Sequence, residues 1–277
     1  MSQRIQNPFS IIVHRWLRVP YALHVRNDNR VAKPKVTLVF LHGLGGSGEM
    51  WHSTIRTLKR QDVRVVTLDL IGFGQSPKPR WATYSAKFQA ASVRLTLAKM
   101  FVTGNVVIVG HSLGALVAIE TQKRYPYVAK ALILCSPPLY VAPDEPGLVR
   151  PERMLRRLFG TLQSNADAFV AVSTFATKYK IVVNKSFNVT EKNVDIFLNT
   201  LHAAITNQTA MKDIVSVRVP VHILHGIFDP LVISANLRSV AKQNKLIRVS
   251  DIPAGHEVMG AYTIPLVSTI NKVVDSL

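Results

Sequence analysis

The residues best suited to chemistry are a serine and two nearby glycines, Gly110, Ser112 and Gly114. They follow a run of apolar, mostly β-branched residues, 106–109, that predicts a buried strand, and they open a helix-compatible run, 113–124. A serine at the apex of a strand–turn–helix is strained, and glycines two positions to either side remove side chains that would collide with it. The pattern predicts a nucleophile elbow. Because five residues alone also fit an ordinary glycine-rich turn, the prediction depends on finding partners elsewhere.

Those partners must come from other strand ends, because the rest of the chain alternates strand and helix patterns. Strands are predicted at 11–19, 21–26, 36–41, 63–68, 130–134, 219–226 and 246–249. Helices are predicted at 49–58, 85–100 and over the last residues of the chain. The run 36–41 is apolar at almost every position, as in a strand covered on both faces. This order predicts an α/β protein with a doubly wound, mostly parallel sheet.

Composition limits the kind of protein. Apolar residues make up 48% of the 277 residues, enough for a sizeable core, and no apolar run approaches the roughly 18 residues that span a bilayer. Residues 1–20 do not resemble a signal peptide, and the single Cys135 excludes an internal disulfide, so we expect a cytoplasmic protein. The net charge of +18 is dispersed along the chain. It predicts no specific nucleic-acid site and at most weak electrostatic association with anionic surfaces.

The strand pattern stops between residues 139 and 216, where helical periodicity takes over. A first helix is predicted with one apolar face, an opposite face of arginines and an end at Gly160. That apolar face comprises Met154, Leu155, Leu158 and Phe159, and the arginines are Arg153, Arg156 and Arg157. A second helix is marked by Phe169, Val172 and Phe175, and a third by Val194, Phe197, Leu198, Leu201 and Ile205.

Three motifs in succession resemble those of the α/β-hydrolase superfamily. They are Leu41-His42-Gly43, then Asp69-x-x-Gly72-x-Gly74-x-Ser76, then the segment 110–114. The resemblance covers about 36–134 and resumes from 219 to the end. It implies a helical cap inserted between the sixth and seventh strands. The implied division is a core of 1–138 and 217–277, with the cap at 139–216.

The resemblance also implies the partners of Ser112, because this superfamily places them in the chain order serine, acid, histidine. A serine needs a base to take its proton, and the base needs an acid to orient it. Asp229 follows a predicted strand and Gly226, and His256 follows the last predicted strand and Gly255. Ser112, Asp229 and His256 are therefore the predicted catalytic residues.

The oxyanion formed during acyl transfer needs two preorganised donors. One is expected to be the backbone N–H of Leu113, directly after the nucleophile. The resemblance implies the backbone N–H of Leu44 as the other. No cluster of His, Cys and Glu has the spacing of metal ligands, so neither a metal nor a cofactor is expected.

Other acids and histidines compete for these roles. Asp69 ends a strand but precedes the serine in the chain, so a structural role near the loop is favoured. Asp251 lies only five residues before His256. His42 belongs to the glycine-rich turn and His111 is expected to point away from Ser112. His225 precedes a turn glycine and is expected to be structural.

Serine at position 112 points to acyl transfer, whereas dehalogenases and epoxide hydrolases of this superfamily use aspartate there. Apolar cap residues, with Leu44 and Leu113, predict an apolar acyl pocket. The expected partner is therefore a small-molecule ester of small to medium size. A lactonase, a monoacylglycerol lipase, a thioesterase, a perhydrolase or a carbon–carbon bond hydrolase remains open on the same triad. A ligand receptor that retains the triad is the alternative of another class.

Overall fold

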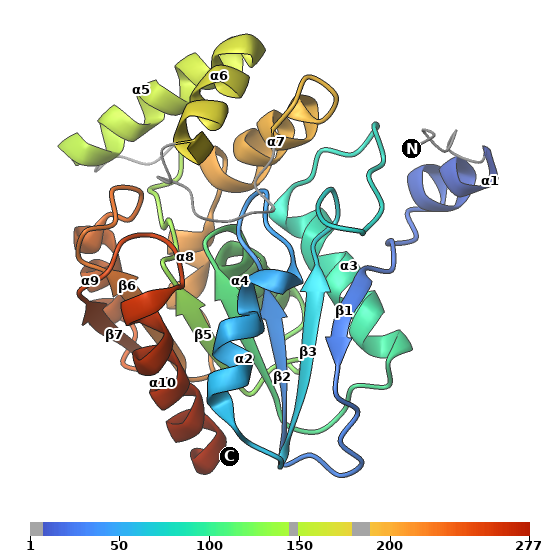
Figure 1. Ribbon diagram of the computed structural model, residues 1–277, viewed down its shortest axis with the longest axis vertical. Helices are drawn as coiled ribbons and strands as arrows, with labels where there is room; N and C mark the ends of the chain where they lie inside the picture. Colours follow the sequence, from blue (N-terminus) through green and yellow to red (C-terminus); the bar gives the residue numbers. More distant parts are fainter. Residues whose placement is uncertain (1–7, 144–148, 179–188) are drawn as a thin grey trace.

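The computed structural model describes residues 8–143, 149–178 and 189–277. A seven-stranded sheet in the order β1-β3-β2-β4-β5-β6-β7 forms its centre (Figure 1). The strands are His24–Asp28 (β1), Val36–Leu41 (β2), Val63–Asp69 (β3), Val106–His111 (β4), Ala131–Cys135 (β5), Val221–Gly226 (β6) and Ile247–Ile252 (β7). Strand β1 runs antiparallel to β3, and every other neighbouring pair is parallel. The predicted α/β fold with a mostly parallel sheet is confirmed.

The sheet is covered by helices on both faces because alternate residues of each strand point to opposite sides. In β2, Leu38 and Phe40 pack with one set of helices, and Val39 and Leu41 pack with the other. The first set is His52–Leu58 (α2), preceded by a 3₁₀ turn at Gly48–Trp51, and Thr263–Ser276 (α10), preceded by one at Gly260–Tyr262. The second is Ala86–Lys99 (α3), Leu113–Arg124 (α4), Ala210–Val215 (α8) and Ser234–Gln243 (α9). All the parallel strands therefore end at one edge of a buried sheet.

Further helices lie above this edge (Figure 1). They are Arg150–Ser164 (α5), Ala166–Lys178 (α6), Val194–Thr200 (α7) and a π-helical continuation, Leu201–Thr206. In the chain they come between β5 and β6 of the observed sheet. The predicted cap, 139–216, also includes 144–148 and 179–188, which lie outside the described residues. None of the helices in the described ranges is long and apolar enough to cross a membrane.

The predicted first strand, 11–19, is wrong. This segment is helical, as a short helix Pro8–Ile11 (α1) continued by π-helical turns at Ile12–Trp16. The β-branched residues at 11–13 favoured a strand, but Phe9, Ile12 and Trp16 recur at spacings of three and four, which is a helical period. With one strand fewer, the cap helices follow the fifth strand rather than the sixth.

The prediction for α5 is wrong in three respects. Met154 and Leu158, predicted to share the apolar face with Leu155 and Phe159, are 73% and 51% exposed and lie on the outer face with Arg153 and Arg157. The helix does not end at Gly160 but continues to Ser164, and a side chain added at Gly160 would meet nothing within 4 Å. Arg156 lies on the inner face rather than the outer one. Its guanidinium donates to the Val141 carbonyl and to the Glu152 carboxylate, which is fully buried. Apolar periodicity could not predict this pair, because the residue types of a buried ion pair are the same as those of an exposed one.

Residues Phe169 and Val172 lie on α6, as the second predicted cap helix requires. The side chain of Phe175, also predicted for that face, is outside the described part of the structure. The third predicted helix corresponds to α7 and its π-helical continuation, and Val194, Phe197, Leu201 and Ile205 are all buried. These helices present apolar side chains toward the strand ends below them.

Candidate active site

Ser112 sits at a strained turn between β4 and α4. Its backbone has φ 50° and ψ −114°, a region that residues other than glycine rarely occupy. The Ser112 N–H donates to the Cys135 carbonyl on β5 over 2.9 Å, which fixes the turn to the neighbouring strand. A Cβ at Gly110 would lie 2.4 Å from the Gly114 carbonyl oxygen, and one at Gly114 would lie 2.3 Å from that of Leu41. Both glycines are therefore required for this turn.

His256 and Asp229 form a directly bonded pair beside it. The His256 Nδ1 lies 2.7 Å from Asp229 Oδ2, and the Asp229 side chain is fully buried. Burial raises the pKa of this carboxyl, but hydrogen bonds from His256, the Leu231 N–H and Ser136, with the charge of His256, hold it below its usual value. An ionised carboxylate only accepts hydrogen bonds, so Nδ1 carries the proton and Nε2 is left as an acceptor.

Main-chain contacts between two strand-end loops bring this pair together. The Ile227 N–H donates to the Ile252 carbonyl over 2.9 Å, and the Phe228 N–H donates to the Ala254 carbonyl over 3.1 Å. The loops approach so closely that a Cβ at Gly226 would lie 2.2 Å from the Ala254 oxygen. Asp229, which follows β6, is thereby held against the loop after β7 that carries His256.

His111 joins the nucleophile turn to the base. Its Nε2 lies 3.0 Å from the His256 carbonyl oxygen, and because a carbonyl only accepts, Nε2 carries the proton. Burial, with the nearby charge of His256, lowers the pKa of His111 to about 3. The ring therefore stays neutral and acts as a fixed donor that positions the His256 backbone. His111 was expected to point away from Ser112, and the structure adds this contact with the neighbouring loop.

The loop after β2 presents the Leu44 N–H. The Gly43 carbonyl accepts from His42 Nδ1 over 2.7 Å and from the Gly46 N–H over 3.0 Å. The described residues contain no cis peptide bond, so the Leu44 N–H points opposite to this anchored carbonyl. The second predicted donor, the Leu113 N–H, opens α4, where the first amides of a helix have no acceptor within the helix.

His42 holds the loop after β2 in place, and its imidazole ring is neutral. Its Nε2 accepts from the Leu70 N–H over 2.8 Å, while Nδ1 donates to the Gly43 carbonyl. The ring is fully buried, and this burial lowers its pKa to about 4. A proton on Nε2 would also displace the Leu70 bond, so burial and hydrogen bonding both favour the neutral ring. His42 thus connects the loop after β2 to the end of β3.

Asp69 lies at the end of β3, away from the pair of Asp229 and His256. Its carboxylate accepts from the Gly48 N–H, the Gln75 N–H and Arg26, each over 2.8 Å. Burial raises the pKa of the carboxyl, but these hydrogen bonds outweigh it and leave the pKa below the usual value. Asp69 therefore joins strand β1, the loop after β2 and the loop after β3. Its contacts are structural in kind.

Asp251 also has other partners. Its carboxylate lies 2.9 Å from His225 Nε2 and 2.8 Å from Arg238 Nη2. The bond to Arg238 lowers the pKa of Asp251, and His225 contributes to the same shift. The structure therefore separates the two competing acids from His256, and only Asp229 is bonded to it among the acids considered.

Ser112 and His256 line one cavity of about 240 Å³. Gly43 and Leu44 line it beside them, which places the predicted oxyanion loop in the same space. Its roof is apolar and comes from α5, α6 and the π-helical segment after α7: Phe159, Leu162, Phe169, Val172, Leu201 and Ile205. A serine hydroxyl, an imidazole and main-chain N–H groups around an apolar space have the chemistry that acyl transfer to or from a hydrophobic group requires.

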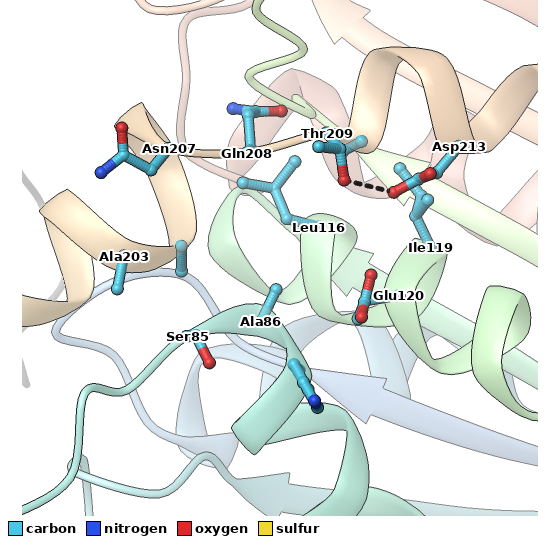
Figure 2. A pocket seen from close by; sticks show the side chains of 13 residues that line it. Ser85, Ala86, Leu116, Ile119, Glu120, Ala203, Asn207, Gln208, Thr209 and Asp213 are labelled. Atoms are coloured by element: carbon cyan, nitrogen blue, oxygen red, sulfur yellow. Dashed lines mark hydrogen bonds between the residues drawn. The ribbon is translucent and has the colours of Figure 1, made fainter. Parts of the chain in front are cut away.

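A second pocket, of about 170 Å³, lies between the start of α3, the middle of α4 and the segment from Ala203 to Asp213 (Figure 2). Its lining is more polar and includes Glu120 and Asp213, whose carboxylate accepts from the Thr209 hydroxyl over 2.6 Å. Neither Ser112 nor His256 lines it. Among the described residues no group of three or more His, Cys, Asp or Glu side chains could hold a metal ion.

Two residues of the candidate active site were not predicted from the sequence. Ser136, directly after β5, contributes a side-chain hydrogen bond to Asp229. Glu257 lines the main cavity next to His256, and burial raises the pKa of its carboxyl despite the opposing charge of His256. Adjacency to a candidate base was the available signal for Glu257. No sequence pattern indicates Ser136, since its contact depends on how two loops meet.

A comparison with known families identifies the family of the chain. Residues 32–255 match the family described as "Serine aminopeptidase, S33", which is more than half of the chain. The chain belongs to this family of α/β-hydrolases. The predicted resemblance to the superfamily is thereby confirmed.

Among curated proteins, this α/β-hydrolase is similar to "Probable lysophospholipase BODYGUARD 4" of Arabidopsis thaliana. The two are 31% identical over 111 residues, which is 40% of this chain and 27% of that protein. The match thus spans about a quarter of the length of this relative. The activity named for that relative belongs to a longer protein.

Solved structures show the same fold at low identity. A thermophilic esterase from Thermogutta terrifontis has a TM-score of 0.68 and 19% identity, covering 92% of this chain and 93% of that one. The enol-lactonase from Burkholderia xenovorans LB400 has a TM-score of 0.69 and 19% identity, covering 92% and 100%. At such identities the likeness supports the α/β-hydrolase fold and leaves the substrate to be argued from the cavity.

Proposed function

We propose that this α/β-hydrolase cleaves carboxylic esters of small to medium, fairly apolar substrates through an acyl-enzyme on Ser112. The observation that carries the proposal is the shared cavity. Ser112 occupies a strained apex beside His256, and the Nδ1 of His256 is bonded to the buried carboxylate of Asp229. This combination supplies a nucleophile, a base in the required tautomer and an ionised acid.

In the acylation step, His256 Nε2 takes the proton of the Ser112 hydroxyl as its oxygen attacks the ester carbonyl. The carbonyl oxygen gains negative charge, which the N–H groups of Leu44 and Leu113 stabilise. Asp229 stabilises the imidazolium through Nδ1. The intermediate then collapses, the C–O bond to the alcohol breaks, and the imidazolium returns its proton to the leaving alcohol.

In the deacylation step, the same groups act on water. His256 removes a proton from a water molecule that attacks the acyl carbonyl on Ser112. The two N–H donors stabilise the second oxyanion, and the proton returns to the serine oxygen as the carboxylic acid leaves. Asp229 keeps its charge throughout, because its own hydrogen bonds hold its pKa low.

The roof of the cavity supports an apolar acyl group. Aromatic and aliphatic side chains of α5 and α6 cover the nucleophile, and among the described lining residues Glu257 supplies the one carboxyl. The similarity to a probable lysophospholipase and to an esterase agrees with an acyl ester. A lactone, a thioester, a monoacylglycerol or a carbon–carbon bond next to a carbonyl would use the same steps, and a substrate panel separates them.

The deciding experiment compares Ser112→Ala with wild type on p-nitrophenyl esters. We expect kcat to fall by about 10⁴–10⁶, because loss of a triad serine removes covalent catalysis. Ser173→Ala changes another serine of the same cavity and should keep more than a tenth of wild-type turnover. A folded Ser112→Ala protein with comparable turnover would refute the proposal. A fluorophosphonate probe should label wild type at Ser112 and leave the variant unlabelled.

The family description adds one substrate class to the panel. An aminopeptidase must hold the ammonium group of its substrate, and Glu257 is the acidic side chain in the cavity lining that could do so. Faster turnover of amino-acid anilides than of matched esters would assign peptidase activity. Acylation of Ser112 without repeated turnover on any member of the panel would instead identify a receptor.

A further inference from the structure

The first described segment of the chain carries its large apolar side chains outward. Ile12, Trp16 and Leu17 are between 51% and 73% exposed. Single exposed apolar residues are ordinary, but three on one short segment form a contiguous patch. The spacing of Ile12 and Trp16 places them one turn apart on the same side of the π-helical turns. Exposed Trp and aliphatic side chains are of the kind that interfacial helices insert at a membrane surface.

The opposite side of the same segment is fixed to the body of the protein. The His14 ring stacks on Tyr21 with 3.7 Å between the ring centroids, and His14 Nδ1 lies 2.7 Å from the Val19 carbonyl oxygen. Tyr21 is itself buried and contacts Trp81 and Phe88. The segment is thus docked through its inner face, and the outward direction of Trp16 follows from that docking.

Positive charge surrounds this patch. Arg15 and Arg18 are exposed beside Trp16, and residues 8–27 contain no Asp or Glu. The first acidic residue along the chain is Asp28. The segment therefore combines apolar side chains with cations and has no acid of its own. This combination is complementary to a surface whose outer layer is anionic and whose interior is apolar.

A second patch of the same kind lies on the outer face of α5. Met154 and Leu158 are 73% and 51% exposed and lie one turn apart. The exposed cations around them are Arg150, Arg153 and Arg157. Glu152, the acidic residue in the first turn of α5, is fully buried on the other face of the helix. Helix α5 and the N-terminal segment both lie at the end of the molecule toward which the parallel strands point (Figure 1).

We propose that these two patches bind a lipid surface that carries anionic headgroups. The N-terminal patch comprises Ile12, Trp16 and Leu17 with Arg15 and Arg18. The α5 patch comprises Met154 and Leu158 with Arg150, Arg153 and Arg157. Trp16 and the aliphatic side chains enter the boundary between headgroups and acyl chains, and the arginines pair with the anionic headgroups.

Binding through both patches would turn the cap, and the cavity beneath it, toward the lipid surface. Val172 lines the cavity roof and is half exposed, on a helix next to α5. A molecule held by both patches therefore presents the capped end of its cavity to the lipid. An amphiphile could pass from the surface to the apolar roof. The binding itself does not require hydrolysis, so Ser112→Ala should bind lipid as wild type does even if the proposed function is wrong.

Apolar and ionic contributions differ in their response to salt. Raising the ionic strength from 0.1 to 1 M shortens the Debye length from about 10 to about 3 Å and weakens the arginine contribution. Burial of Trp16 and Leu17 is not screened. Binding should thus decline with salt and retain a residual component, unlike the fully salt-sensitive association that dispersed charge alone predicts.

The experiment is co-sedimentation of the full chain with phosphatidylcholine vesicles that contain either 0% or 30% phosphatidylglycerol. Wild type should bind the anionic vesicles at least tenfold more tightly. W16S/L17S should reduce binding about tenfold or more, M154S/L158S should reduce it as well, and the four changes together should remove the component that survives high salt. R15Q/R18Q should reduce the preference for phosphatidylglycerol, R150Q/R153Q/R157Q should reduce it as well, and both sets should leave the residual component.

Two matched controls come from the opposite edge of the sheet. F101S/Y127S removes two exposed aromatic side chains, 85% and 92% exposed, that precede β4 and β5. K99Q/K130Q removes two exposed cations that also precede those strands. Both should bind as wild type does. Reductions equal to those of the test pairs would overturn the proposal, because general hydrophobicity and net charge would then explain binding.

Tryptophan emission provides a local readout. The chain has three tryptophans, of which Trp51 is fully buried and Trp16 is exposed. Emission should shift to the blue on addition of anionic vesicles, and Trp16→Phe should abolish the shift while retaining most binding. Absence of vesicle binding, a shift unaffected by Trp16→Phe, or loss of the exposed surface through self-association in light scattering would each refute the proposal. Circular dichroism melts verify that every variant is folded.

Discussion

The loops at the strand ends are joined by hydrogen bonds to main-chain groups, whereas the helices above the cavity are held mainly by packed apolar side chains. His42 and His111 each bond to a backbone atom of another loop, and Asp229 bonds to the Leu231 N–H of its own loop. In the roof, Phe197 contacts Phe73 and Phe169 through ring edges and tilted faces. The first kind of contact fixes positions and directions, and the second mainly fixes volume.

Because the two regions are held by different contacts, substitutions in the strand-end loops and in the helices above the cavity should have different effects. A hydrogen bond has one donor, one acceptor and a narrow geometry, so one substitution in the loops misplaces a reacting atom. Apolar packing tolerates exchange of one side chain for another of similar volume. Substitutions in the loops should therefore alter the rate of chemistry, and those in the roof should alter which substrate fits.

The largest expected effect among the loop acids is that of Asp229→Asn. An amide at this position can donate to His256 Nδ1, which favours the tautomer with its proton on Nε2 and leaves no acceptor for Ser112. We expect kcat for p-nitrophenyl esters to fall by about 10³–10⁴. Steady-state kinetics on folded protein measures this.

The matched controls are Asp251→Asn and Asp69→Asn. Asp251 pairs with His225 and Arg238, so its replacement should lower kcat less than tenfold. Asp69→Asn weakens the buried bond to Arg26 and should lower the melting temperature more than the turnover number. If Asp69→Asn slows a folded enzyme more than Asp229→Asn does, the acid is misassigned.

A second prediction concerns the pH dependence of stability, which should originate in the loops. His42 and His111 have pKa values lowered by burial to about 4 and about 3 in the folded state. Below pH ~6.5 the unfolded chain protonates both while the folded protein does not, so stability falls as pH falls. Each ring should contribute about 1.4 kcal/mol per pH unit between pH ~6 and ~4.5.

Urea unfolding at several pH values in this window measures the slope. His111→Gln should lower the slope by about one proton, and its kcat should fall as well because the His256 carbonyl loses its donor. An unchanged slope would show that His111 titrates normally in the folded protein. The described cap residues supply no buried histidine to this window.

These contrasts also explain what the sequence could and could not predict. The order of strands and helices after residue 20 and the turn at Ser112 follow from local patterns, because strand periodicity and strand-end motifs are short-range signals. Asp229 and His256 were predicted from their places after strands together with the superfamily's chain order of serine, acid and histidine. The bond from His111 to the His256 carbonyl spans 145 positions, and no spacing rule indicates it. The catalytic roles themselves stay predictions until turnover is measured.

Errors arose where one pattern fits two structures. Ile12 belongs both to a β-branched run and to a helical period with Trp16, and the segment folds as a helix exposed on one side. Arg156 was assigned to the outer face of α5 because arginine is usually exposed, yet it pairs with buried Glu152. Propensity and average burial are weaker than tertiary context at such positions.

The roof offers the final contrast, between side chains that line the cavity and side chains that only pack. Phe159 and Phe169 line the cavity, while Leu155 and Phe197 do not appear in its lining and pack against the core beneath the cap. All four are bulky side chains of predicted cap helices, so their sequence patterns do not separate them. The structure therefore divides them into two test and two control positions.

Phe159→Ala and Phe169→Ala should enlarge the space over Ser112 and shift the preferred acyl chain to greater length, by about tenfold in the ratio of kcat/KM for long over short esters. Because Phe197 packs against Phe73 and Phe169 without lining the cavity, Phe197→Ala should mainly destabilise the protein, by about 3–5 kcal/mol, as should Leu155→Ala to a smaller extent. The measurements are kcat/KM over an acyl series and the melting temperature for each of the four variants. A shift in chain-length preference for Phe197→Ala as large as for Phe159→Ala would mean that the roof acts as one unit. In that case general loosening of the cap, rather than the lining of the cavity, would determine which substrates fit.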